Sequence, residues 1–342
     1  MKILCYTDNH FCEKVSIVTR YGTRYTARLE NQLQSVNWAE ALAVEKGCDM
    51  IVCLGDFFDH AHLTDQELTA LNDIEWAAIP HYFLVGNHES EEHDLQYSST
   101  MALIGDNRFI ITKPEIKKVP GAELAFLPYV VESDKRPLLD YFPEPGTDVR
   151  LLFSHNDILG MQLGPIVSKS GFSIEELESV SDLCLNGHLH NGAAISSRVV
   201  NLGNLTGKDF GEDATKYKHG VMIIDTDTMK VDFIENPYAF NFYKLDLESP
   251  TDLQKLTTLK NNAVLSLKCR DSMIKEVRDY LETLSAVVDS RIIVLRDPSE
   301  AADLEIDISS LVVDQCAKFA ECCRAKLDNN DILELELAEI LK

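Results

Sequence analysis

The sequence is short of positive charge. Lysine and arginine together number 32, against 56 aspartates and glutamates, so the 342-residue chain carries a formal net charge of −24 at pH 7. An enzyme that holds nucleic acid by itself is expected to carry a basic stripe on its surface. The acidic balance therefore indicates either a small substrate or a nucleic acid that is held mainly by a partner subunit.

The features of membrane and secreted proteins are also missing. No apolar run approaches the roughly 20 residues of a membrane helix, and strand-like sequence begins at once, without the basic and apolar segments of a signal peptide. The nine cysteines are odd in number and lack paired spacing, and Cys5, Cys53 and Cys184 lie within expected strands. We therefore expect reduced thiols, a cytoplasmic location and no membrane association.

What the sequence does contain is a set of five short apolar runs that end in metal-binding residue types. The central run, 49–54, leads through Gly55 to Asp56. The other four runs, 2–6, 81–85, 150–153 and 183–185, lead to Asp8 and His10, to Asn87 and His88, to His155, and to His188 and His190. Such runs are typical of strands buried on both faces, and α/β sheets place ligands at the carboxyl ends of their strands. Carboxylate and amide oxygens suit Mn or Mg, and imidazole suits Mn, Fe or Zn, so these ends predict a site for a pair of divalent metals.

The sequence around each histidine indicates whether it is a metal ligand, a general acid or a surface residue. His188 and His190 are two positions apart, so both can face one site in an extended or tight-loop segment. His88 directly follows Asn87, which offers a neutral oxygen ligand, and therefore points elsewhere in the pocket; it suits a general acid better than a metal ligand. We interpret His60 and His62 as ordinary surface residues, because the other motifs already supply enough ligands.

In their order along the chain, these motifs resemble those of the calcineurin-like metallophosphoesterases. The resemblance implies two metal sites that share Asp56. The first would be completed by Asp8, His10 and His190, and the second by Asn87, His155 and His188. The family implies in-line hydrolysis of a phosphoester, with His88 donating to the scissile phosphate or the leaving oxygen, and manganese as the usual activator, with Mg, Fe and Zn left open.

Two positions depart from the family pattern. Asp59 stands where some nucleases of the family carry a second active-site histidine, and Glu89 replaces the commoner aspartate after the motif histidine. Neither change removes a ligand.

The numerous short strands, with few long helices between them, predict an α/β fold of two packed sheets, a β-sandwich flanked by helices. We expect helices from about Thr26 to Lys46 and from Thr64 or Asp65 to Ala78, and a hairpin that pairs 221–224 with 230–234. The expected domains are a catalytic domain over 1–248, a small cap domain over 249–300 and an acidic helical tail over 301–342. The cap would be a β-α-β unit built from 262–268, 272–285 and 287–295.

Within the superfamily, the layout resembles the SbcD type in its compact phage version, the nuclease subunit of DNA double-strand-break repair and recombination complexes. This implies a DNA exonuclease or endonuclease that forms a homodimer, with 65–78 and 94–104 as contact faces. It also implies an SbcC-type coiled-coil ATPase partner that docks on the tail from about 311 to 342. A small-molecule nucleotide phosphodiesterase or phosphatase of the same superfamily is the alternative, which the acidic charge favours and the cap and tail disfavour. A scaffold that has lost catalysis is a third possibility, against which the complete ligand set argues.

Two further groups of residues have alternative interpretations. Arg20, Arg24 and Arg28 could grip phosphates or belong to a solvated loop. The aromatic residues of 238–243 could stack on bases, although a linker strand that closes the core is the better interpretation.

Overall fold

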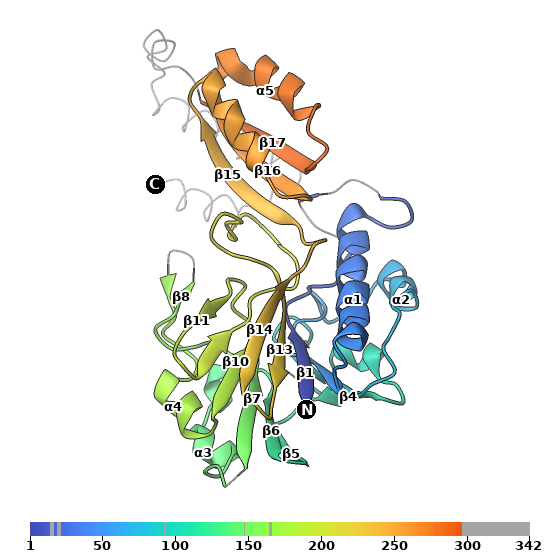
Figure 1. Ribbon diagram of the computed structural model, residues 1–342, viewed down its shortest axis with the longest axis vertical. Helices are drawn as coiled ribbons and strands as arrows, with labels where there is room; N and C mark the ends of the chain where they lie inside the picture. Colours follow the sequence, from blue (N-terminus) through green and yellow to red (C-terminus); the bar gives the residue numbers. More distant parts are fainter. Residues whose placement is uncertain (14–16, 19–21, 92–93, 147, 164–165, 296–342) are drawn as a thin grey trace, which may run out of the picture.

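The computed structural model describes residues 1–13, 17–18, 22–91, 94–146, 148–163 and 166–295. A two-sheet body forms the lower part of Figure 1, and a small three-stranded unit stands above it. The expected acidic tail, 301–342, lies outside the described residues. Among the helices of the described part, none combines the length and the apolar character that crossing a bilayer requires.

Each of the two large sheets has six strands. The strands of the first sheet are β1 (Lys2–Tyr6), β2 (Met50–Cys53), β3 (His81–Leu84), β4 (Arg108–Ile111), β13 (Gly220–Asp225) and β14 (Lys230–Glu235). Its order is β14-β13-β1-β2-β3-β4, with β1 to β4 parallel and the predicted β13–β14 hairpin antiparallel.

The second sheet also contains four parallel strands, but it has an antiparallel strand at each edge. Its strands are β5 (Glu115–Val119), β6 (Ala122–Leu127), β7 (Val149–Ser154), β10 (Leu183–Asn186), β11 (Ala193–Ala194) and β12 (Val199–Asn201). The order is β11-β12-β10-β7-β6-β5, in which β12, β10, β7 and β6 are parallel and the two edge strands antiparallel. A separate pair, β8 (Gln162–Leu163) and β9 (Ile166–Val167), lies outside both sheets.

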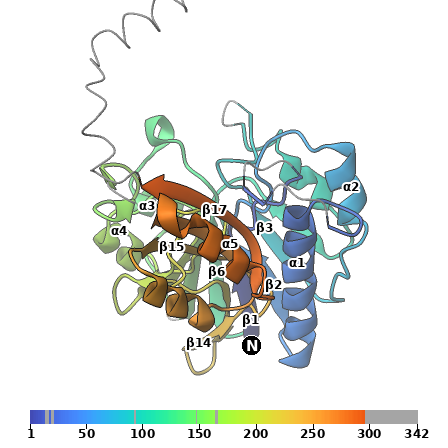
Figure 2. The same ribbon diagram turned by 90° about the horizontal axis from the view of Figure 1, so that it is seen from above.

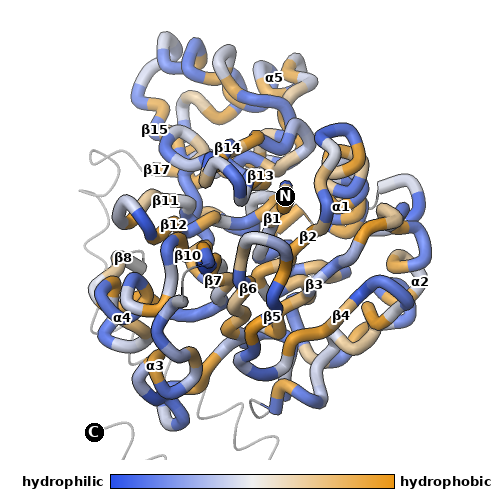
Figure 3. Tube along the Cα trace, turned by 60° about the horizontal axis from the view of Figure 1, so that its bottom comes forward, coloured by the Kyte–Doolittle hydropathy of each residue, from blue (hydrophilic) through white to orange (hydrophobic). Residues whose placement is uncertain are grey.

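The sheets pack face to face, and this interface forms the central core. Ile3, Val52 and Leu84 from the first sheet meet Phe126 and Phe153 from the second, all of them buried. Figure 3 shows this concentration of hydrophobic residues along the central strands. Burying both faces of the parallel strands requires helices on the outside. The first sheet is covered by α1 (Ala27–Glu45), and the second by α3 (Leu138–Tyr141) and α4 (Ile174–Ser179). The predicted two-sheet α/β sandwich is confirmed.

Helix boundaries agree with the expectations only in part. The α1 helix begins where predicted, because the Thr26 side chain accepts a hydrogen bond from Leu29 N at the N-terminus. The α2 helix (Asp65–Leu71) ends well before the predicted Ala78. Beyond it, the backbone is held by α1: Glu75 N donates to Asn37 and Ala77 N to Glu40. The predicted helix over 94–104 is a short 3-10 helix, η1 (Ser99–Leu103); a second one is η2 (Glu132–Asp134).

The small unit is a parallel sheet in the order β15-β16-β17. Its elements are β15 (Asn241–Leu247), η3 (Pro250–Thr258), β16 (Ala263–Arg270), η4 (Asp271–Met273), α5 (Ile274–Leu281) and β17 (Val287–Leu295). The expected strand-helix-strand unit is therefore present as β16, α5 and β17. Although β15 lies before residue 248, where the sequence predicts a domain boundary, it pairs with β16 and so belongs to this sheet.

Candidate metal centre

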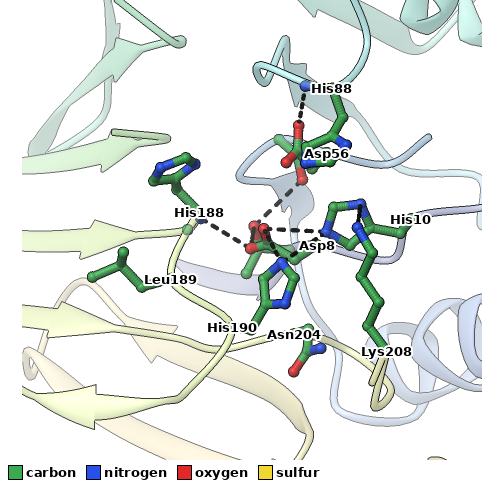
Figure 4. A network of polar contacts seen from close by, with 12 residues as sticks. Asp8, His10, Asp56, His88, His188, Leu189, His190, Asn204 and Lys208 are labelled. Carbon is green, nitrogen blue, oxygen red and sulfur yellow. Dashed lines mark hydrogen bonds and ion pairs between the residues drawn. The ribbon is translucent and has the colours of Figure 1, made fainter. Parts of the chain in front are cut away.

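The predicted ligands come together at the carboxyl ends of β1, β2, β3, β7 and β10. Figure 4 shows five of them: Asp8, His10, Asp56, His188 and His190. Several adopt a left-handed backbone, which non-glycine residues rarely do: Asp8 (φ 50°), His10 (φ 48°), Asp56 (φ 48°) and His188 (φ 74°). Hydrogen bonds between the loops hold this conformation, since Asp8 N donates to Gly55 O and His10 N to Asp56 O, each over 3.0 Å. Such backbone strain gathers at functional sites.

One half of the centre is formed by Asp8, His10 and His190, whose ligand atoms all lie within 4.8 Å of one another. The Nε2 atoms of the two histidines are 3.0 Å apart. Asp8 Oδ1 lies 3.8 Å from the first and 3.9 Å from the second. This oxygen is buried and accepts no hydrogen bond from the described residues. A buried carboxylate oxygen without a donor is costly in a protein, and a bound cation removes that cost.

The outer nitrogens of these two histidines face carboxylates. His10 Nδ1 lies 2.9 Å from Asp59 Oδ1, and His190 Nδ1 lies 3.0 Å from Glu212 Oε1. A carboxylate only accepts hydrogen bonds, so we assign the proton to each Nδ1, which leaves each Nε2 lone pair facing the centre. Lys208 Nζ also lies 3.2 Å from His10 Nδ1, but the contact of this nitrogen with Asp59 is shorter. Burial lowers the pKa of His10 to about 4, which keeps its ring neutral at pH 7, as metal ligation requires.

The other half of the centre contains Asp56, Asn87, His155 and His188. Asp56, His155 and His188 again have ligand atoms within 4.8 Å of one another. Asn87 Oδ1 lies 2.9 Å from His188 Nδ1 and 3.3 Å from His155 Nε2. Burial alone would lower the pKa of His155, but nearby carboxylates, Asp56 first among them, outweigh burial and raise it to about 9. The local excess of negative charge is what a divalent cation would neutralise.

The outer contacts of these two histidines select the ligating nitrogens. His155 Nδ1 lies 2.8 Å from Leu54 O, so the ring presents Nε2 to Asp56 Oδ2 at 3.2 Å. His188 Nε2 lies 3.2 Å from Asp157 Oδ1, so this ring presents Nδ1 instead. Hydrogen-bonded histidines of this kind are typical of metal sites, in which the outer partner sets the tautomer and the ring orientation.

Asp56 lies between the two halves, because its ligand atom also falls within 4.8 Å of His10 and His88. Two glycines allow the loops around Asp56 to approach each other. Gly55 has φ +117°, a conformation that L side chains rarely adopt. A Cβ on Gly86 would collide with the Asp56 carboxylate and with Asp56 N. Gly55 and Gly86 are therefore both required: Gly55 by its backbone conformation and Gly86 by the close approach of its loop to Asp56.

His88 stands at the rim of the centre. Its backbone N donates to Asp56 Oδ1 over 3.0 Å, and its ring packs edge-on against His10 with the centroids 4.8 Å apart. The side chain is 38% exposed, more than those of the ligand histidines, of which His190 is the most exposed at 25%. Its Nδ1 lies 3.2 Å from Asp59 O, so a protonated ring can donate to a substrate through Nε2.

Three residues near the centre were missed by the sequence analysis, and a fourth, Glu89, was noted there only as a departure from the family pattern. Glu212 and Lys208 come from a loop without a recognisable motif, and Lys208 Nζ donates to Asp59 Oδ1 over 2.7 Å. Asp157 follows His155 by two positions, and this spacing is the only feature of the sequence that could have indicated a role for it in the centre. Glu89 is buried and accepts from Phe58 N and Gly86 N, over 3.1 and 2.8 Å, and so joins two of the ligand loops. Burial, with Asp56 close by, raises the pKa of Glu89 to about 7.

Other candidate residues lie outside the centre. His60 and His62 lie outside the groups of possible ligands found among the described residues, and they pair with Glu67 and Glu91, over 3.0 and 2.9 Å. Arg20 is not among the described residues.

Neither interpretation of the arginine group holds for Arg28. Its side chain is buried, and it donates to Gly207 O. It is thus unavailable to a phosphate and is not solvated, because α1 packs it beneath the 207–212 loop. Arg24 is exposed and pairs with Asp73 over 2.6 Å.

The donor set fits a pair of divalent cations. The described residues bring together two aspartates, an asparagine oxygen and four histidines, a mixture that suits Mn, Fe or Zn. Asp8, His10 and His190 with Asp56 would hold one ion, and Asp56, Asn87, His155 and His188 the other, the division that the sequence analysis expected.

Comparisons with known proteins agree with this chemistry. Residues 1–192, more than half of the chain, match the family model of the calcineurin-like phosphoesterases. No curated protein matches the sequence.

The similar solved structures share little sequence with this chain. A dimetal phosphatase from Danio rerio has 15% identity and a TM-score of 0.39, covering 65% of this chain and 91% of that one. The calcineurin-like phosphoesterase YfkN from Bacillus subtilis has 11% identity and a TM-score of 0.38, with coverages of 69% and 88%. A metallophosphoesterase from Sphaerobacter thermophilus has 13% identity and a TM-score of 0.30, with the same coverages. Likeness at this level carries no argument about the substrate.

Proposed function

The chain belongs to the calcineurin-like phosphoesterase family, and we propose that it is a metal-dependent nuclease, the DNA-cleaving subunit of a recombination and double-strand-break repair complex of the SbcD type. Metal-dependent phosphoester hydrolysis follows from the family and from the donor set of the centre. DNA as the substrate and the repair complex as the setting are the proposal.

The observation that carries the proposal is the position of the small unit. It lies on the side of the sandwich to which the carboxyl ends of β1 to β3 point, and over the body when viewed from above (Figures 1 and 2). It contacts loops near the centre, since Val18 N donates to Asp289 over 3.1 Å and Arg291 lies over the Phe210 ring. A polymer needs guidance beyond its scissile bond, whereas a small phosphoester does not. The unit therefore favours an extended substrate.

The side chains of the centre can each take a role in hydrolysis. When bound, the two divalent cations would polarise the scissile phosphate and make water a better nucleophile. Asp56 would contact both ions and hold the two halves together. His88, oriented by the Asp59 carbonyl oxygen, would donate a proton through Nε2 to the leaving oxygen. Manganese remains the metal that we propose.

The net charge of −24 is the reason to propose partners. A coiled-coil ATPase of the SbcC type, docking on residues from about 311 to 342, would supply the basic DNA-binding surface that this chain lacks. We also propose a homodimer. The expected contact faces, 65–78 and 94–104, carry three exposed apolar side chains: Leu68 (43%), Tyr97 (78%) and Ile104 (61%). Burying such side chains favours association.

The test is cleavage of linear duplex and single-stranded DNA by the purified chain with Mn²⁺, beside a His88→Ala variant and a bis-nitrophenyl phosphate assay. The assay is repeated with the ATPase partner, and with a chain truncated after Ser310. The proposal expects Mn-dependent DNA cleavage that His88→Ala abolishes, and ATPase association that the truncation abolishes. Association that survives the truncation would contradict the proposed dock.

A small-molecule nucleotide phosphodiesterase or phosphatase is the second candidate. The second candidate is favoured because three basic side chains that could otherwise bind the DNA backbone are engaged elsewhere. Arg24 pairs with Asp73, Arg28 is buried, and Lys208 pairs with Asp59. Hydrolysis of nucleotides and of the small ester, with no DNA cleavage even when the partner is present, would select this candidate over the nuclease.

A further inference from the structure

We propose that the loop formed by residues 207–212, called the bridging loop below, makes the small sheet a positioning element for one half of the metal centre. Through this loop, Arg291 on β17 acts on the ligands His10 and His190, but not on His155 and His188. The inference rests on the metal-dependent activity proposed above and assigns a role in it to the small unit.

At its inner end, the bridging loop holds both ligand histidines of the Asp8 half. The buried Glu212 carboxylate faces His190 Nδ1 at 3.0 Å and also accepts from Asn204 and from Lys208 N, over 2.8 and 2.7 Å. Lys208 Nζ reaches Asp59 Oδ1, the oxygen that also faces His10 Nδ1. Figure 4 shows Lys208 extending to the His10 ring and His190 beside it. Both outer partners, Asp59 and Glu212, thus depend on one loop.

At its outer end, the bridging loop is attached to the small sheet. Phe210 is nearly buried and packs edge-on against Phe242 of β15, with the ring centroids 5.1 Å apart. The Arg291 guanidinium covers the same ring, 4.2 Å from its centroid. Backbone bonds flank this contact, from Gly207 N to Phe240 O over 3.2 Å and from Ala214 N to Phe242 O over 3.0 Å. A shift of β15 or β17 is therefore transmitted to Lys208 and Glu212.

The other half of the centre has no such connection within the described residues. The outer contacts of His155 and His188 are Leu54 O and Asp157, neither of which belongs to the bridging loop. The proposal consequently predicts an asymmetric effect. A change at the small sheet should weaken one metal site and spare the other, whereas general destabilisation should affect both.

The experiment measures Mn²⁺ binding to the full chain by titration calorimetry, in the wild type and in Arg291→Ala. Arg291 is exposed, so its replacement leaves no cavity, although it also removes the hydrogen bond from Arg291 Nε to Ser266 Oγ on β16, which measures 3.0 Å. We expect one of two binding events to weaken by about 2-fold to about 30-fold, the usual range for a residue that modulates a site from a distance. The other event should be unchanged, and Arg291→Lys should restore part of the lost affinity because a lysine also interacts with an aromatic ring.

Two further variants identify the route. Lys268→Ala, on the adjacent strand β16 and away from the bridging loop, is the matched control and should leave both events unchanged. Glu212→Gln should weaken the same event as Arg291→Ala, by about 10-fold to about 100-fold, because it alters the direct partner of a ligand histidine. In the Glu212→Gln background, Arg291→Ala should add little, since both changes act through one loop.

The outcomes separate the inference from the proposed function. If both events are unchanged in Arg291→Ala, if both weaken equally, or if the wild type binds no metal, the inference is overturned. If the asymmetric effect is found but DNA is not cleaved even with the partner, the inference stands and the nuclease proposal fails.

Discussion

His10 and His190 are 180 positions apart in the chain, yet their Nε2 atoms lie 3.0 Å from each other. Their Nδ1 atoms face the carboxylates of Asp59 and Glu212, so both Nε2 lone pairs point to the same place. Two lone pairs at that distance repel each other unless a cation or a proton lies near them. A cation bound between the rings, or a proton on one of them, removes this repulsion. Burial alone would lower the pKa of His190, but its hydrogen bond with Glu212, together with the charges of Asp8 and Glu212, outweighs burial and raises it.

Metal binding is therefore expected to stabilise the fold. Addition of Mn²⁺ at 100 times its dissociation constant should raise the free energy of unfolding by about 2.7 kcal/mol per site, because the ions bind the folded state and not the unfolded one. Thermal unfolding with Mn²⁺ and with a chelator measures the difference. Asp8→Asn, which removes one negative ligand, should reduce the gain. Equal midpoints with and without metal would argue against the centre.

Replacement of His88 should separate catalysis from metal binding. We expect His88→Ala to lower turnover by about 10²-fold to about 10⁴-fold, the usual contribution of a general acid. Mn²⁺ affinity should stay within about 2-fold of the wild type, because the half-exposed ring is held at the rim. Steady-state kinetics on bis-nitrophenyl phosphate and metal titration provide the two readouts. His62→Ala, a 78% exposed side chain paired with Glu91, is the control and should behave as the wild type. Loss of metal affinity in His88→Ala would make His88 a ligand instead.

A methyl group at Gly86 should displace the central carboxylate. The Cβ of Gly86→Ala would collide with Asp56, and overpacking of this kind costs about 1–3 kcal/mol. We expect lower stability and a loss of both metal-binding events, since Asp56 lies between the two halves. Gly146→Ala, where a Cβ meets nothing within 4 Å, provides the matched control. Two intact binding events in Gly86→Ala would mean that Asp56 does not serve both ions.

The pair of Glu123 and Arg150 should make stability depend on pH far from the metal centre. Hydrogen bonds from Arg150 lower the pKa of Glu123, with Arg150 Nε donating to Glu123 Oε2 over 2.8 Å. A carboxyl with a lowered folded-state pKa stabilises the protein above its unfolded pKa of about 4.3, and this contribution is lost as pH falls through the folded-state value.

Glu123→Gln should consequently cost about 1–3 kcal/mol at pH 7, through loss of a charge-assisted hydrogen bond. The cost should shrink as the pH falls through the folded-state pKa, where the wild-type carboxyl is itself protonated. Urea unfolding of the wild type and of Glu123→Gln, across a pH series from 7 downward, measures the difference in the free energy of unfolding at each pH. An equal cost throughout would show that the charge of Glu123 is not what stabilises the pair.

Local patterns predicted much of the fold correctly. The α1 helix was predictable because a helical repeat and the cap at Thr26 lie within one segment. The end of α2 was not, because residues after Leu71 are held by Asn37 and Glu40 of another helix. The partner of β15 was missed for a similar reason: an apolar run indicates a strand but not the strand beside which it lies.

The candidate site likewise has features that the sequence predicts and features that only the tertiary structure determines. The sequence by itself determined which side chains can meet a metal, since Asp8, Asp56, Asn87 and the paired histidines each follow directly on a buried strand, and parallel strands end at one edge. Only the tertiary structure decided how those ligands are oriented. Asp59, Glu212 and Asp157 engage the outer nitrogens of His10, His190 and His188. Glu212 and its neighbour Lys208 come from a loop without a motif, and Lys208 meets Asp59 across 149 positions. A contact of that separation depends on how the loops of the two large sheets pack against each other, and no local pattern encodes it.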